Sequence, residues 1–330
     1  MSSSSAPRLR ALVRRILPWV ISAGTLGYVF GYAIEWDAIP EATAGADLPL
    51  FIAITVADKI LFFVVWGVLQ ARVVERFVEP VSVGSVLSIK GGSELVRTFA
   101  NSLGDAAFAL GVSQLARGSL AAVVAVVMIP FGCHFGILLT QATLALPLLE
   151  GGLSGNRDVL ALVVAGWGIV AGVVLTGRLG VWRRLLAQAG LIDWFDRVDA
   201  RGLWPFFGWF ALFAACDVLI QGAASRAFGV AIPWIDLTAR IPLLYFALAI
   251  PSFGNFGPRE IMWAAAFADH APRETLIAFA LWTNAIFMAM HAVIGMLFFG
   301  RALELLRQVR GSKSEADRER ESRLPDAIEP

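Results

Sequence analysis

The sequence predicts an all-α integral membrane protein with about six transmembrane helices and two re-entrant helical hairpins. Hydrophobic residues occupy 58% of the 330 positions and charged residues only 16%, a balance far from that of a soluble globular domain. Several apolar runs reach the roughly 20 residues that a helix needs to cross the hydrocarbon core. Two further apolar runs are broken in the middle by glycines and charged residues, which predicts hairpins rather than crossings.

The unbroken runs predict crossings at residues 16–34, 48–70, 118–144, 158–177, 203–223 and 275–300. The first broken run covers residues 83–112 and is interrupted by "KGGSELVR". The second covers 237–268 and is interrupted by "IPSFGNFGPRE". Loops at that depth must be buried in protein or line a wet cavity, because lipid satisfies no backbone polar group. Two complete crossings at each place would leave both ends of the chain on the same side of the membrane as a hairpin would. That alternative therefore stays open.

Arginines close to the expected crossings favour one orientation. With the N-terminus in the cytoplasm, fifteen of them fall on the cytoplasmic side, and four, Arg157, Arg226, Arg240 and Arg273, fall outside. This bias follows the positive-inside rule. We therefore expect a multi-pass protein of the cytoplasmic (inner) membrane with both termini in the cytoplasm.

The order of crossings and hairpins predicts an inverted repeat, with halves at residues 1–149 and 150–300. Asp58 and Asp217 occupy the second crossing of their halves, and each hairpin has glycine before glutamate, in "GGSE" and "GPRE". Residues 1–310 are expected to form the membrane domain, and 311–330 a disordered cytoplasmic tail without apolar periodicity. Residues 179–195 form either a helix on the membrane surface or a loop packed on the bundle.

Charged residues within the apolar runs are the candidates for function, because each costs about 2.5–3.5 kcal/mol on insertion scales. They are Asp58, Lys59, Lys90, Glu94, Arg97, Asp105, Asp217, Arg259 and Glu260. Asp58 and Lys59 are adjacent and point about 100° apart on a helix. We expect them not to pair with each other, and one of them to find a partner in a hairpin. The alternative is that these charges form ion pairs that only fix the hairpins in place.

The second interruption predicts an anion site. Gly254 and Gly257 permit a sharp turn or a close approach of the backbone, as Gly91 and Gly92 do in the first interruption. Pro258 fits the first position of a helix, whose N-terminus favours negative charge. Arg259 lies in the same first turn and could bind a phosphate, while Glu260 offsets part of its charge.

The stretch "IPSFGNFGPREIMWAAAF" resembles the end of the lysylphosphatidylglycerol synthase transmembrane (flippase-like) family. The matching positions are Pro251, Ser252, Gly254, Gly257, Arg259 and Glu260. Gly92, Glu94 and Arg97 resemble an earlier Gly-Glu-x-x-Arg element of that family, although an extra serine separates the glycine from the glutamate. The resemblance implies a membrane domain that moves lipids or lipid-linked molecules between leaflets. The chain shows no aminoacyl-transferase domain, so lysyl transfer is not expected.

We therefore expect translocation of a lipid with an anionic or phosphate head group. The expected substrate-binding residues are Arg259, Glu260, Gly257, Gly254, Ser252, Asn255, Glu94, Arg97, Lys90, Gly92, Asp58 and Asp217. No catalytic residue, metal or cofactor is expected, since the three histidines lack metal-site spacing. His134 and His291 are open to packing or proton-relay roles.

Two alternatives remain. One is a membrane enzyme that acts on a lipid phosphate or glycolipid, with Glu94 or Glu260 as general base. The other is a scaffold that transports nothing and binds a partner enzyme. Nucleic acid is not an expected partner, because no basic stripe is interleaved with aromatic residues. The sequence does not define the oligomeric state.

Overall fold

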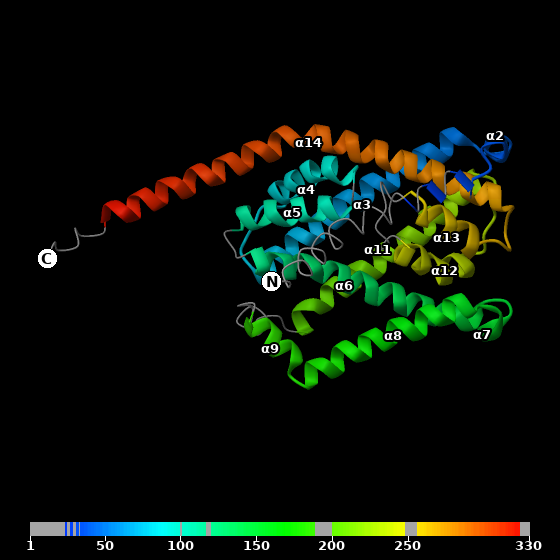
Figure 1. Ribbon diagram of the computed structural model, residues 1–330, viewed down its shortest axis with the longest axis horizontal. Helices are drawn as coiled ribbons and strands as arrows, with labels where there is room; N and C mark the ends of the chain where they lie inside the picture. The colour runs from blue at the N-terminus through cyan, green and yellow to red at the C-terminus, as the bar shows by residue number, and fades with distance from the viewer. Residues whose placement is uncertain are drawn as a thin grey trace, which may run out of the picture.

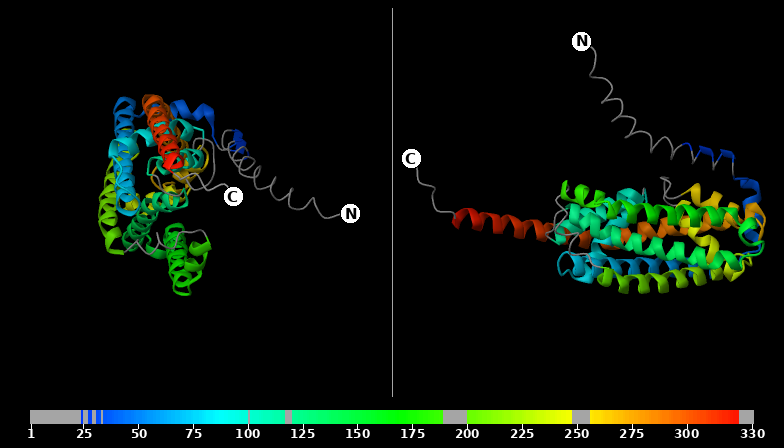
Figure 2. Two further views of the ribbon diagram at one scale, coloured as in Figure 1. Left: turned by 90° about the vertical axis from the view of Figure 1, so that its left-hand side faces the viewer. Right: turned by 90° about the horizontal axis from the view of Figure 1, so that it is seen from below.

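The computed structural model describes residues 34–99, 101–116, 120–188, 200–247 and 256–323, and before them residues 24, 27, 28, 31 and 32. Within these ranges the chain is helical and has no strand, which confirms the all-α class (Figure 1). The long helices run along one common direction, and α14 continues well beyond one end of the bundle (Figure 2).

Five helices of the described residues are long and apolar enough to cross a membrane. They are α3 (Leu48–Phe77), α6 (Leu120–Ala145), α8 (Arg157–Arg178), α11 (Ala200–Ala227) and α14 (Arg273–Arg323). In length and composition, these helices match five of the six expected crossings. The other, at residues 16–34, lies largely outside the described residues.

Each broken run contains two shorter helices. The first pair is α4 (Val83–Arg97) and α5 (Asn101–Leu115), and the second is α12 (Trp234–Ala247) and α13 (Pro258–Ala266). A helix of 15 residues such as α4 is only about 22 Å long, less than the ~30 Å hydrocarbon core. The first pair lies at the end of the bundle where α3 ends, and the second at the end where α14 begins (Figure 1).

The break in the first run is not where the sequence predicted it. "KGGSELVR" lies inside α4, and the helix ends after Arg97, so among the described residues the break falls at Thr98 and Phe99. The two glycines serve packing against α14: a Cβ on Gly91 would lie 2.4 Å from Phe298, and one on Gly92 would lie 2.6 Å from Ala302. Small residues allow helices in membranes to approach this closely.

The second break falls within the predicted motif, although residues 248–255 lie outside the described part. Gly257 has φ +102°, which side-chain-bearing residues rarely adopt, and Pro258 follows as the first residue of α13. The Glu260 carboxylate accepts a hydrogen bond of 2.6 Å from the Gly257 N–H. The sequence Gly-Pro-Arg-Glu thus ends a turn and begins a helix within four residues.

Short helices complete the described chain: η2 (Trp36–Ala38), α2 (Ile39–Ala44), η3 (Leu146–Leu148), α7 (Gly152–Gly155) and α9 (Val181–Gln188). The α9 helix covers part of the segment expected at the membrane surface, and residues 189–199 lie outside the described part. The disorder expected from residue 311 differs from the structure, because α14 continues to Arg323. Glu, Arg and Ala in this segment are good helix formers, and extending an existing helix requires no new nucleus.

Two apolar clusters fill opposite ends of the bundle. On α3, Phe51 belongs to one cluster and Trp66 to the other. On α11, Val218 belongs to the first and Phe213 to the second. The buried charged residues of α3, Asp58 and Lys59, lie between Phe51 and Trp66 along that helix. The core therefore consists of two apolar ends with a polar band between them.

Candidate functional site

Asp58 and Lys59 begin the polar band on α3, and both are buried. Lys59 Nζ lies 3.5 Å from Glu94 Oε2 on α4 and 3.3 Å from His291 Nε2 on α14. Asp58 lies instead within electrostatic range of Asp217 and Arg259. The expected divergence of the two side chains is confirmed, and so is the expected partner for one of them in a broken run.

Glu94 is the centre of the first group of charges. Its Oε1 lies 3.3 Å from Arg97 Nε and 3.8 Å from Lys90 Nζ, and its Oε2 contacts His291 Nδ1. Arg97 also pairs with Asp105 of α5 at 2.5 Å. We name Lys59, Lys90, Glu94, Arg97, Asp105 and His291 the Glu94 cluster. With neutral His291, three cations face two carboxylates, so the cluster carries one excess positive charge.

The second group surrounds the start of α13. The Glu260 carboxylate accepts hydrogen bonds from the Gly257 N–H at 2.6 Å and from Asn284 Nδ2 at 2.7 Å. The first bond caps the N-terminus of α13, and the second attaches α13 to α14. Glu260 acts electrostatically on Arg259, but the two side chains form no ion pair within 4.0 Å. The carboxylate also covers the helix N-terminus, which leaves the guanidinium as the group available to an anion.

Arg259 is buried, with 6% of its surface exposed. Its Nη1 donates a long hydrogen bond of 3.4 Å to Asn284 Oδ1, and its Cζ lies 4.9 Å from the centre of the Phe287 ring. No carboxylate oxygen of the described residues lies within 4.0 Å of the guanidinium. A buried arginine is ordinarily paired with an acidic group, because desolvation of an unpaired charge is expensive. Among the described residues, Arg259 therefore has no acidic group in contact with it, although its burial makes such a partner favourable.

Two aspartates lie near Arg259 without forming a contact ion pair. Asp217 accepts a 2.9 Å hydrogen bond from the Tyr245 hydroxyl and a 3.4 Å bond from Gln221 Nε2. Asp58 is 8% exposed and makes no hydrogen bond or ion pair with the described residues. We name Asp58, Asp217, Gln221, Tyr245, Arg259, Glu260 and Asn284 the Arg259 cluster. Its three carboxylates and one guanidinium contrast with the excess positive charge of the Glu94 cluster.

The two clusters meet at Phe287 of α14. Lys59 Nζ lies 5.7 Å and Arg259 Cζ lies 4.9 Å from the centre of this ring. Lys59 is in turn 3.5 Å from Glu94. These three distances place Glu94 and Arg259 well within ~20 Å of each other, as we expect if both broken runs reach one polar region of the ~30 Å core. Helices α3, α4, α13 and α14 all contribute to this region.

Not every expected site residue lies in this band. Ser252, Gly254 and Asn255 lie outside the described residues, so their positions stay predictions. Gly92 is in the α4–α14 interface, where a side chain would meet Ala302. The other expected site residues belong to the two clusters or to the turn that begins α13: Lys90, Glu94, Arg97, Asp58, Asp217, Gly257, Arg259 and Glu260.

Sequence reasoning missed the uncharged members of the band: Asn284, Tyr245 and Gln221. Asn284 and His291 are seven residues apart, which places them on the same face of α14, and this spacing was the signal that could have found them. Gln221 follows Asp217 by one helical turn. His134 packs its ring among aromatic residues, including Tyr245 at 4.9 Å between ring centres, as expected for a packing residue.

Comparison with models of known protein families finds none that matches the chain, and comparison with curated proteins finds no match either. The assignment of a function therefore depends on the geometry of the polar band.

Proposed function

We propose that the protein moves a lipid, or a lipid-linked molecule, with an anionic or phosphate head group from one leaflet of the membrane to the other. One observation carries this proposal: Arg259 is buried at the start of a short helix, and no carboxylate of the described residues is in ionic contact with it. A phosphate would supply the missing counter-charge, and the planar guanidinium can bind two phosphate oxygens at once.

The surrounding charges suit transient binding. Asp58 and Asp217 act on Arg259 at longer range, so they neutralise part of its charge when no head group is bound. An arriving phosphate is attracted by Arg259 and repelled by the two aspartates. Partial opposition of this kind limits the depth of the binding minimum, which a transporter needs because a tightly held substrate would not leave.

The Glu94 cluster would supply a second attractive region. This cluster reaches the same ring as Arg259, because Lys59 Nζ lies 5.7 Å and Arg259 Cζ lies 4.9 Å from the centre of Phe287. In our proposal the α4–α5 and α12–α13 pairs are re-entrant hairpins that belong to inverted halves of the chain. The placement of the two pairs at opposite ends of the bundle supports this topology (Figure 1). Both termini would then be in the cytoplasm, and the acyl chains would stay in the bilayer.

The Glu94–His291 contact favours a second hypothesis, an enzyme that acts on a lipid phosphate. A carboxylate beside one imidazole nitrogen is a common arrangement for a general base. However, the other nitrogen of His291 lies 3.3 Å from Lys59 Nζ, so in this arrangement it faces an ammonium group and not a substrate. The translocation hypothesis uses more of the observed contacts.

Reconstitution separates the two hypotheses. Purified protein is placed in liposomes that contain phospholipids labelled on the head group, and a membrane-impermeant quencher reports the outer-leaflet fraction over time. We expect protein-dependent exchange of an anionic phospholipid, with intact lipid recovered by mass spectrometry. Covalent conversion of the lipid would support the enzyme. The absence of both exchange and conversion across a panel of anionic head groups would contradict the proposal.

A further inference from the structure

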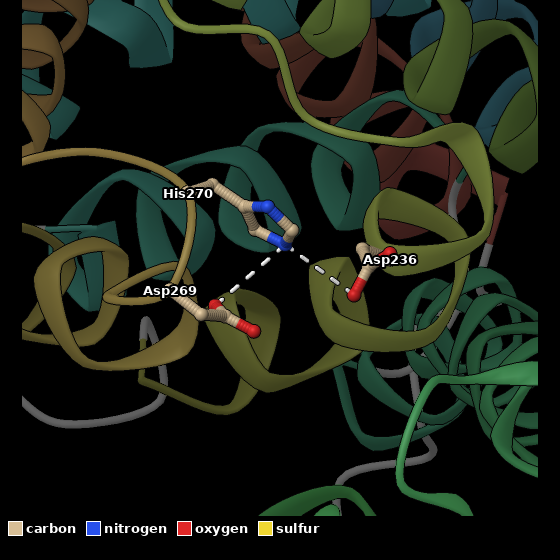
Figure 3. A group of neighbouring side chains, drawn as sticks. All are labelled: Asp236, Asp269 and His270. Carbon is tan, nitrogen blue, oxygen red and sulfur yellow. Dashed lines mark ion pairs between the residues drawn. The ribbon is translucent and has the colours of Figure 1, made fainter.

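A separate group of ionisable side chains lies at the end of the bundle where α12 begins. Asp236 is in the first turn of α12, and Asp269 and His270 lie between α13 and α14. His270 Nε2 is 3.4 Å from Asp236 Oδ1 and 3.6 Å from Asp269 Oδ1 (Figure 3). One ligand atom from each of the three residues lies within 4.8 Å of the others. We name these three residues the Asp236–Asp269–His270 cluster.

Arg240 holds the carboxylates of this cluster in place. Its Nη1 and Nη2 donate to the two oxygens of Asp269 at 2.7 and 3.0 Å, and its Nη2 lies 3.4 Å from Asp236 Oδ1. The same guanidinium donates to Asn156 Oδ1 and to the Ala266 carbonyl, which fixes its own position. The two hydrogen bonds from Arg240 fix the orientation of the Asp269 carboxylate.

The imidazole nitrogen of His270 is not satisfied by these neighbours. Nε2 is buried and makes no hydrogen bond with the described residues, although it faces oxygens of both carboxylates. If Nε2 carries no proton, its lone pair points at anionic oxygens, an arrangement that is repulsive unless a cation lies between them. The two carboxylates of the cluster and the guanidinium of Arg240 together carry one net negative charge, which a bound cation would offset.

We propose that Asp236, Asp269 and His270 bind a divalent metal ion of the zinc type. In a tetrahedral site with zinc–ligand bonds of about 2.0–2.1 Å, neighbouring ligand atoms lie about 3.3 Å apart. The two distances from His270 Nε2, 3.4 and 3.6 Å, are close to this value. Arg240 would act as the outer partner that orients the carboxylate ligands, because each carboxylate oxygen has a second lone pair. The fourth position is open to water.

The imidazole determines which metal is expected. Calcium and magnesium prefer oxygen ligands alone, whereas zinc commonly combines imidazole with carboxylates. The positive charge of Arg240 opposes a dication, so we expect binding that is saturable but weaker than in a structural site of four protein ligands. A bound ion would join the beginning of α12 to the segment after α13, and so connect the two ends of the second broken run. This inference does not depend on the proposed lipid translocation.

The test is zinc binding by untagged, detergent-purified protein that has been treated with a chelator and returned to metal-free buffer. Isothermal titration with Zn2+ gives the affinity and stoichiometry, with Ca2+ and Mg2+ as separate titrations. The visible absorption of bound Co2+ reports imidazole coordination independently. Variants are Asp236→Asn and His270→Gln, and the matched control is Asp37→Asn, which changes an exposed aspartate in η2.

We expect wild type to bind one Zn2+ per chain, with no comparable binding of Ca2+ or Mg2+. Both cluster variants should bind zinc about tenfold or more weakly, while Asp37→Asn should match wild type. The absence of saturable Zn2+ binding in folded wild-type protein would overturn the proposal, whether or not the variants fold. Wild-type zinc affinity in folded His270→Gln would also overturn it, because the imidazole would then not be a ligand.

Discussion

Lys59 Nζ lies 3.5 Å from Glu94 Oε2, while Asp58, the adjacent residue, lies in the field of Asp217 and Arg259. One dipeptide of α3 therefore serves both buried clusters. Each residue places its charge near groups of opposite sign on a different broken run, so α3 links the two runs electrostatically. A change of charge in either cluster should therefore alter the electrostatic environment of the other, through α3 and through Phe287.

Replacement of Glu94 tests its central place in the first cluster. Glu94→Gln removes the carboxylate that neutralises Lys59, Lys90 and Arg97 in part, so buried cations would lose their shared partner. We expect a loss of about 3–5 kcal/mol in the free energy of unfolding. Thermal or denaturant unfolding in detergent measures this loss.

The matched control for that experiment is Glu75→Gln. Glu75 pairs with Arg72 at 2.7 Å, but both side chains are largely exposed, so the pair is worth about 0–1 kcal/mol. A Glu94→Gln loss no larger than that of Glu75→Gln would show that the Glu94 cluster contributes little to the fold.

The sequence revealed the polar composition of the band but not its full geometry. Intramembrane charges such as Glu94 and Arg259 are expensive in lipid, so their presence alone predicted buried sites. The divergence of Asp58 and Lys59 followed from helical geometry. In contrast, Glu94 contacts His291, which is 197 positions away, and local sequence pattern does not specify such a contact.

The placement of the first break also lay beyond sequence reasoning. Two adjacent glycines and four polar residues in "KGGSELVR" are typical of a loop, and intrinsic propensity disfavours glycine in a helix. The structure places this segment in α4, because its glycines permit contact with Phe298 and Ala302 and its charges are paired. Tertiary packing overrides local propensity here.

Close packing of α4 on α14 gives a second prediction. A Cβ on Gly295 would lie 2.6 Å from the backbone nitrogen of Leu95, which cannot move aside as a flexible side chain could. Gly295→Ala should therefore reduce the free energy of unfolding by about 1–3 kcal/mol. Gly300→Ala, on the same helix but with open space around its Cβ, should be neutral or stabilising by up to about 1 kcal/mol. Equal melting temperatures for the two variants would contradict the close contact.

Tyr245 gives a third prediction, because its hydroxyl donates to Asp217 at 2.9 Å. Tyr245→Phe keeps the ring and removes this bond, leaving Asp217 with only the longer bond from Gln221 among those described. We expect a loss of about 1–3 kcal/mol in stability. Tyr28→Phe changes an exposed tyrosine and should have no measurable effect. Unfolding transitions that coincide for the two variants would count against the Tyr245–Asp217 bond.

The proposed orientation is tested with single cysteines in a background where Cys133 and Cys216 are serine. Cysteines at the exposed positions Glu41 and Glu150 should react with an impermeant thiol reagent added to intact cells. A cysteine at Arg178, which is also exposed, should react only after the membrane is permeabilised. Labelling of position 178 in sealed cells would contradict cytoplasmic termini.

The most direct test of the proposed function is lipid exchange by Arg259 variants in liposomes. Arg259→Ala removes the buried charge, whereas Arg259→Lys keeps a point charge without the planar fork. Glu260 keeps its bonds to Gly257 and Asn284 in both variants, so we expect them to remain folded. Arg178→Ala, which removes an exposed arginine, is the control. We predict that Arg259→Ala slows exchange about tenfold or more, that Arg259→Lys is intermediate, and that adding Glu260→Gln to Arg259→Ala restores nothing. Wild-type exchange by folded Arg259→Ala would contradict the role of Arg259 as the head-group site.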